Sequence, residues 1–147
     1  MFTVYQRKLP HWRADAATYF VTWRIDRARP DLDPAERDLV SLALRHFDGE
    51  RYELLAYVVM NDHVHVVVTP RPGRNLEQIV HSWKSYSAHR LRAGRSGRVW
   101  QPEYYDRIIR NEAELSQKIE YTLGNPFTRW PDLTEYPWVW TRWADDA

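Results

Sequence analysis

The spacing of apolar positions predicts four short strands along the chain. Each run combines β-branched and aromatic residues, which favour extended backbone, and turn-forming residues bound it. The runs cover residues 18–25, 52–60, 63–69 and 104–110. Because only Asn61 and Asp62 separate the second run from the third, residues 52–69 are expected to form an antiparallel hairpin.

Three helices are predicted where apolar residues recur at intervals of three and four. Their expected ranges are 34–47, 76–92 and 111–124. Asp33, Asn75 and Asn111 stand at the three starts, and such side chains accept hydrogen bonds from the free N–H groups there. The third helix is expected to end at Gly124-Asn125-Pro126, because proline lacks the N–H that would continue it.

The order strand, helix, strand, strand, helix, strand, helix predicts an α+β fold. It is that of a ferredoxin-like antiparallel sheet, βαββαβα, with the helices on one face. The opposite face is then expected to be open to a ligand. A length of 147 residues fits one domain, residues 1–147, in which residues 127–147 form a tryptophan-rich C-terminal tail without clear periodicity.

Composition excludes several classes of site. The chain has no cysteine, so disulfides, thiolate nucleophiles and cysteine-ligated metals are excluded. No apolar run approaches the roughly 20 residues that a membrane helix needs. We therefore expect a cytoplasmic protein without a membrane partner.

The charges are segregated along the chain although the net charge is only +1. Of the 21 basic residues 18 are arginine, whose planar guanidinium suits phosphate. Residues 1–29 and 71–110 carry net charges of +4 and +6, whereas residues 30–70 and 111–147 carry −5 and −4. The basic blocks could form one electropositive surface if the fold brings them together, and an ordinary mixed surface is an equal alternative.

Basic and polar side chains on the second helix and the loop after it are candidates for phosphate contacts. With basic residues at the start of that helix and on the last helix, the candidate phosphate-binding set is Arg74, His81, Lys84, Arg92, Arg95, Arg98 and Lys118. A solvated helix face would carry the same residues. Trp12, Trp100 or the tail tryptophans could stack on unpaired bases.

His63 and His65 lie two residues apart in the third strand, so both side chains point to one face. Val64, Val66 and Val68 then point to the core, which places the histidines on the open face. Two adjacent neutral imidazoles are natural metal ligands. Two surface histidines without a ligand are the simpler alternative at this stage.

Tyr121 falls on the polar side of the last predicted helix, about 145° from the centre of its apolar arc at 100° per residue. A phenol in that position can attack phosphorus if a metal polarises the phosphate. Asn125 follows one turn later and offers an amide oxygen, and Lys118 adds a positive charge. An amphipathic surface tyrosine is the alternative.

Five segments in order match one family pattern. They are residues 18–24 (TYFVTWR), 57–68 (YVVMNDHVHVVV), 83–87 (WKSYS), 99–112 (VWQPEYYDRIIRNE) and 119–126 (IEYTLGNP). Together they resemble the small single-tyrosine HUH transposases of bacteria, in their REP-associated branch. Asn61 departs from the proline often found after Met60, and residues 127–130 depart from the small, glycine-containing segment often found after Pro126.

The resemblance implies a metal-dependent transposase that nicks and rejoins single-stranded DNA. His63 and His65 would hold Mg²⁺ or Mn²⁺, with Asn125 as a third ligand. Tyr121 would attack the scissile phosphate, which gives a 5′-phosphotyrosine intermediate and a free 3′-OH. The DNA partner would be a short palindromic hairpin of the REP type with a tetranucleotide beside its stem.

Other functions stay open from the sequence. A domesticated hairpin-binding protein without catalysis would keep the basic surface. A two-histidine phosphoesterase would need two H-x-T/S motifs, and the chain has a single H-x-H. A ferredoxin-like regulatory protein would make the histidines incidental. The spacing also leaves open a monomer or a homodimer, with the tyrosine supplied by the same chain or by a partner.

Overall fold

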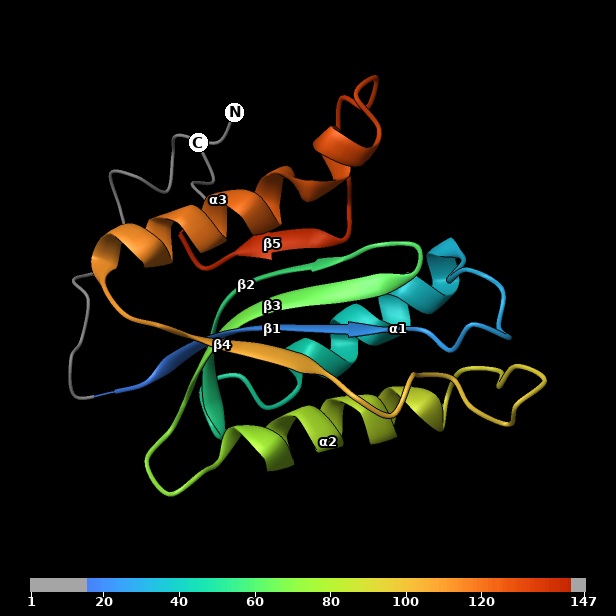
Figure 1. The fold of residues 1–147 in the computed structure, drawn as a ribbon, viewed down its shortest axis with the longest axis horizontal. Helices are drawn as coiled ribbons and strands as arrows, with labels where there is room; N and C mark the ends of the chain where they lie inside the picture. The colour runs from blue at the N-terminus through green and yellow to red at the C-terminus, as the bar shows by residue number, and fades with distance from the viewer. Residues whose placement is uncertain (1–15, 144–147) are drawn as a thin grey trace.

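The computed structural model describes residues 16–143, which form a five-stranded antiparallel sheet with three helices (Figure 1). The elements are β1 Thr18–Arg24, α1 Pro34–Arg45, β2 Tyr52–Val59, β3 His63–Pro70, α2 Leu76–Ala88, β4 Tyr105–Ile109, α3 Glu112–Arg129 and β5 Val139–Thr141. Spatially the strands run β4-β1-β3-β2-β5. The α+β class and the order of the first seven elements are therefore as predicted, and β5 is an addition.

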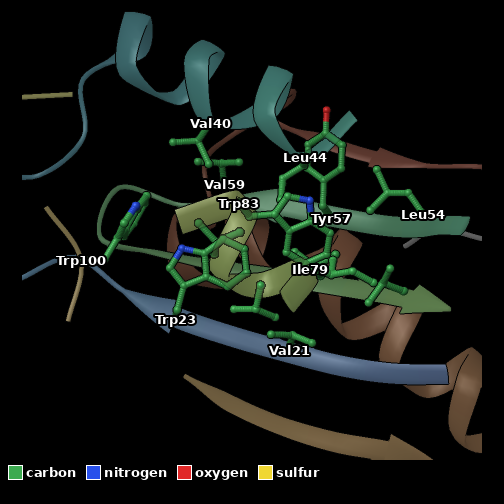
Figure 2. Close-up of a cluster of buried hydrophobic side chains, with 14 of the residues drawn as sticks. Val21, Trp23, Val40, Leu44, Leu54, Tyr57, Val59, Ile79, Trp83 and Trp100 are labelled. Atoms are coloured by element: carbon green, nitrogen blue, oxygen red, sulfur yellow. The ribbon is translucent and has the colours of Figure 1, made fainter. Parts of the chain in front are cut away.

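The main core lies between the sheet and helices α1 and α2. Val21 and Trp23 of β1 and Val64 and Val66 of β3 point into it, as the alternation of the strands predicted. Trp83 of α2 stacks on Trp23 with ring centroids 5.7 Å apart (Figure 2). Burial of each such side chain stabilises the fold by roughly 1.5–3 kcal/mol.

Helix α3 crosses the other face of the sheet (Figure 1). Its residues Leu115, Ile119 and Leu123 pack against Phe20 and Val67, which belong to β1 and β3. The prediction of all helices on one face was therefore wrong in this detail. The physical reason is that apolar side chains alternate onto both faces of these strands, so each face needs a cover.

The end of α3 also differs from the prediction. Instead of stopping at Gly124, the helix continues through Pro126 to Arg129, and Trp130 N–H donates to the Pro126 carbonyl at its end. Gly124 does not adopt the left-handed conformation that ends many helices; within residues 16–143 only Gly49, Gly73 and Gly97 do. Residues 127–129 thus belong to α3 and not to the tail.

The rest of the tail packs on the domain. β5 pairs with β2, with Trp140 opposite Tyr57. The Arg37 guanidinium of α1 lies 4.7 Å from the ring centroid of Trp138, whose indole N–H donates to Asp38. Three paired residues are too few to predict a strand from sequence.

These contacts decide the role of several tryptophans. Trp100 is buried in the main core, so its predicted stacking on DNA is wrong. Trp138 and Trp140 pack on the same core from the tail, and Trp130 stacks on Tyr136. Trp12 lies outside the described residues. None of the helices in residues 16–143 combines the length and apolar character needed for a membrane span.

Candidate active site

His63 and His65 lie side by side on β3, with ring centroids 4.7 Å apart. They occupy the face that α3 crosses, opposite the main core. In the neighbouring strand β1, Thr22 pairs with His65 and Arg24 pairs with His63. The predicted pairing of the imidazoles is present. The expectation of an open face is wrong for His65, which is only 4% exposed and stacks on Phe20.

Tyr121 of α3 approaches this pair of imidazoles from the side. Its ring centroid lies 5.4 Å from that of His65 and 5.9 Å from that of Phe20. The apolar arc of α3 binds the sheet, which leaves Tyr121 at the edge of the contact. The side chain is 51% exposed, so the phenol is accessible to a substrate.

One nitrogen of each imidazole is held by a side chain of the protein. His63 Nδ1 lies 2.6 Å from Asp62 Oδ1, and because an ionised carboxylate only accepts, Nδ1 carries the hydrogen and Nε2 keeps its lone pair. His65 Nδ1 lies 2.7 Å from Thr22 Oγ1. The buried His65 Nε2 has no hydrogen-bond partner among the described residues. Metal-binding histidines have this arrangement, with one nitrogen oriented and the other free.

His65 is neutral near physiological pH. Burial lowers its pKa from 6.5 to about 3, and electrostatic interactions with His63, Arg24 and Lys118 act in the same direction. A neutral imidazole can donate a lone pair to a cation without first losing a proton. Burial of His65 therefore favours its use as a ligand.

His63, His65 and Asn125 are the candidate ligands for a divalent cation. Asn125 lies one turn after Tyr121, and its buried Oδ1 also lacks a partner within residues 16–143. In that part of the chain no three His, Cys, Asp or Glu residues cluster to hold a metal. Two imidazole nitrogens and one amide oxygen leave positions for phosphate and water, which fits Mn²⁺ and Mg²⁺.

Two cations flank the imidazoles. Lys118 Nζ lies 4.8 Å from the ring centroid of Phe20, beside His65. Arg24 is exposed at the end of β1 and pairs with His63. Arg24 was not among the predicted site residues, because its position beside His63 depends on the register between β1 and β3. Arg24 and Thr22 are two residues apart in a strand, so their side chains share one face of the sheet. This spacing is the sequence feature from which Arg24 could have been predicted.

The remaining predicted DNA contacts are spread over the surface. The Lys84 ammonium donates to the backbone carbonyls of Gln101, Pro102 and Glu103 at 2.7, 3.1 and 3.2 Å, so it holds that segment in place. Burial lowers the pKa of Lys84. His81 and Arg98 line the same hollow of about 590 Å³.

Three arginines lie in other places. Arg74 lines a hollow at the start of α2, together with Arg71. Arg95 lines another hollow with Arg27, and Arg92 is exposed after the end of α2. The basic residues thus line several hollows, and those of Arg98 and of Arg95 adjoin each other at Ala93.

Comparison with known proteins gives consistent matches. The chain is 24% identical over 110 residues to the REP-associated tyrosine transposase of Escherichia coli (strain K12), which covers 74% of this chain and 66% of that protein. The match thus spans just under two thirds of the curated relative's length.

Two solved structures share the fold. A REP-associated tyrosine transposase bound to a REP hairpin superposes with a TM-score of 0.70 at 21% identity, covering 89% of this chain and 82% of that chain. A candidate transposase from Deinococcus radiodurans R1 gives a TM-score of 0.57 at 23% identity, covering 78% of this chain and 98% of that chain. The resemblance to REP-associated tyrosine transposases, first read from five motifs, is confirmed.

The family model described as "Transposase IS200 like" matches residues 16–122. This range holds both histidines of β3 and also Tyr121, and it covers more than half of the chain. With the juxtaposed imidazoles and phenol and the shared fold, this match shows that the chain belongs to the IS200-like transposase family.

Proposed function

We propose that this protein cleaves and rejoins single-stranded DNA beside a hairpin, through a covalent bond between Tyr121 and a 5′ phosphate. The observation that carries this proposal is the meeting of a half-exposed phenol from α3 with two imidazoles from β3. Both imidazoles are oriented through Nδ1, which leaves Nε2 for a ligand. The positions of the phenol and the imidazoles suit phosphoryl transfer in the same chain.

The reaction is a transesterification. Tyr121 Oη attacks the phosphorus of the scissile phosphodiester and loses its proton to solvent. The bond from phosphorus to the 3′ oxygen breaks, and that oxygen takes the electron pair and then a proton. The products are a 5′-phosphotyrosine bond on one DNA fragment and a 3′-OH on the other. Attack by a 3′-OH on the phosphotyrosine reverses the step, so the strand is rejoined without an external energy source.

Each side chain of the site has a proposed role. His63, His65 and Asn125 would hold Mg²⁺ or Mn²⁺, and when bound the cation would polarise the phosphate. Asp62 and Thr22 hold the imidazoles with Nε2 toward it. Lys118 and Arg24 bind phosphate oxygens of the DNA.

We further propose that the DNA partner is a hairpin. The relatives include a protein called a REP-associated tyrosine transposase and a structure of such a transposase bound to a REP hairpin. The hollows lined by Arg71 and Arg74, and by Arg27 and Arg95, suit the phosphates of a duplex stem. The unpaired strand then reaches Tyr121. Such a substrate is met on the chromosome, in the cytoplasm of a bacterial cell.

A labelling experiment tests the proposal. Hairpin oligonucleotides labelled at the 5′ or the 3′ end are incubated with the protein, with and without Mn²⁺, and denatured products are separated by size. We expect a covalent adduct that carries only the 3′ label, requires Mn²⁺ and is lost in Tyr121→Phe and His63→Ala. Tyr86→Phe is the matched control, because Tyr86 belongs to α2 and stacks on His46, on the other side of the sheet.

Two results would contradict the proposal. An adduct that survives Tyr121→Phe would mean that another residue is the nucleophile. Tight hairpin binding without any adduct would show a hairpin-binding protein that has no nuclease activity.

A further inference from the structure

A hollow of about 970 Å³ lies beside Tyr121, on the side of α3 that faces the segment after the helix. Its lining residues are Gln117, Glu120, Tyr121, Gly124, Asn125, Phe127, Thr128, Leu133 and Thr134. We name it the Gly124 hollow. It shares Tyr121 and Asn125 with the candidate active site, so a DNA strand held at Tyr121 passes next to it.

The charge of the Gly124 hollow differs from that of the other hollows. Its described lining contains no lysine or arginine, and Glu120 is the charged residue in it. The hollows elsewhere are lined by cations such as Lys84, Arg74 and Arg95. A carboxylate repels phosphate, so the Gly124 hollow is unsuited to the DNA backbone and suited to an uncharged base.

Neither the backbone conformation nor the packing of the fold requires a glycine at position 124. Glycine in a helix interior is less stable than alanine, and Gly124 has no left-handed φ that would require it. A Cβ built at this position meets no atom within 4 Å. Glycine is also used where a ligand closely approaches the backbone, which gives a reason for its presence here.

The walls of the hollow have the properties of a base-binding site. Phe127 and Leu133 supply partly buried apolar surface. Polar groups surround this surface, and in the described part of the chain the side chains of Gln117, Glu120 and Thr128 form no hydrogen bond or ion pair with other residues. Apolar surface for a base face and polar groups for its edge are the means by which proteins bind unpaired bases.

We propose that the Gly124 hollow binds one unpaired nucleobase next to the scissile phosphate, with the base lying against α3 at Gly124. This inference rests on the proposed function, because it uses a strand anchored at Tyr121. Glu120 lies one turn before Gly124 and its carboxylate only accepts hydrogen bonds. The hollow is therefore suited to a base whose edge presents a hydrogen-bond donor to Glu120, either an exocyclic amino group or a ring N–H.

Binding of modified hairpins tests the proposal. The probe is a fluorescent DNA hairpin with an unpaired extension, and single abasic sites are placed along the extension. For the unmodified protein we expect one abasic position to weaken binding by roughly 10-fold or more, which is the scale of base stacking on proteins. Gly124→Leu, which fills the hollow, should weaken binding of the intact hairpin by a similar factor and should be insensitive to that abasic site.

Controls separate occlusion from misfolding. Ala113→Leu adds the same side chain to an exposed position of α3 away from the hollow and should bind like the unmodified protein. Gly124→Ala should fold at least as well as the unmodified protein, as followed by thermal unfolding. Glu120→Gln should change which base is preferred at the sensitive position, because the amide can donate a hydrogen bond where the carboxylate only accepts.

The outcomes distinguish the two proposals. If Gly124→Leu binds as tightly as Ala113→Leu, or if it is as sensitive to the abasic site as the unmodified protein, the nucleobase site is wrong even when adducts form at Tyr121. If the abasic pattern appears without any adduct, the nucleobase site stands and the nuclease proposal fails. Absence of binding to every hairpin overturns both.

Discussion

The two faces of the sheet use the same strands for different purposes. Toward α1 and α2, strands β1 and β3 present Val21, Trp23, Val64 and Val66, all nearly or fully buried. Toward α3 the apolar contact is limited, and the strands continue into polar residues such as Thr22 and His65. The first face supplies most of the stability, and the second accepts buried polar groups that can do chemistry.

This difference explains where the candidate site lies. Phe20 and Val67 hold α3 by its apolar arc, so the polar edge of the helix stands over the polar part of the sheet. Tyr121 and His65 meet at that boundary, where water is partly excluded and a phosphate can still enter. A face that was apolar throughout would bind α3 more tightly and would hold no site.

The largest expected effect comes from a substitution on the α3 face, which should abolish activity and leave stability almost unchanged. Tyr121→Phe removes the proposed nucleophile and should abolish adduct formation. The free energy of unfolding should change by less than about 0.5 kcal/mol, because the phenol is half exposed. Gel analysis of adducts and urea denaturation measure the two quantities, and a large loss of stability would contradict the division between the faces.

The opposite pattern is expected on the core face. Trp23→Ala removes a fully buried ring that contacts Trp83 and Trp100, and should lower the free energy of unfolding by about 3–5 kcal/mol. Urea denaturation measures this change. A loss below about 1 kcal/mol would mean that the main core does not carry the stability of the fold.

The stability of the protein should depend on pH in the acid range because the imidazole of His65 is buried. The folded-state pKa of His65 is lowered to about 3, so between pH 6.5 and that value the unfolded chain binds a proton that the folded chain does not. Stability should therefore fall with decreasing pH in this window, by about 1 kcal/mol per pH unit from this residue. His65→Gln, which cannot titrate, should show a shallower slope in metal-free thermal unfolding, and equal slopes would count against the burial of His65.

A further prediction concerns Asp62, which orients the imidazole of His63. Asp62→Ala frees the His63 ring and should weaken Mn²⁺ binding by roughly 10–100-fold, as loss of such a partner does at other metal sites. Calorimetric titration of Mn²⁺ without DNA measures the affinity. Asp106→Ala, at an exposed carboxylate of β4, is the control and should leave it unchanged.

The smallest effect is expected at the outer side of α3. Gly124→Ala should raise the free energy of unfolding by up to about 1 kcal/mol, because alanine favours the helix interior and its Cβ meets no atom. Thermal unfolding measures the gain. A loss of stability would indicate a structural need for glycine and remove one support for the nucleobase site.

Local pattern predicted the secondary structure wherever neighbours in sequence set the outcome. The capping box of Asp33 and Glu36 at the start of α1 is present as expected, with hydrogen bonds of 2.9 and 3.0 Å. Asn75 and Asn111 cap α2 and α3. Gly124-Asn125-Pro126 was misjudged, because the burial of Pro126 against the rest of the molecule outweighs the backbone hydrogen bond that proline cannot form.

By itself the sequence determined that His63 and His65 share one face of a strand and that Tyr121 stands off the apolar arc of its helix, since both follow from the backbone repeat. Only the tertiary structure decided that these side chains meet, that Arg24 and Thr22 join them, and that Gly124 opens onto a hollow beside the phenol. The repeat of a strand or helix fixes direction within one element. Position between elements depends on strand register and on which face of the sheet α3 covers, and these are set by packing across the whole chain.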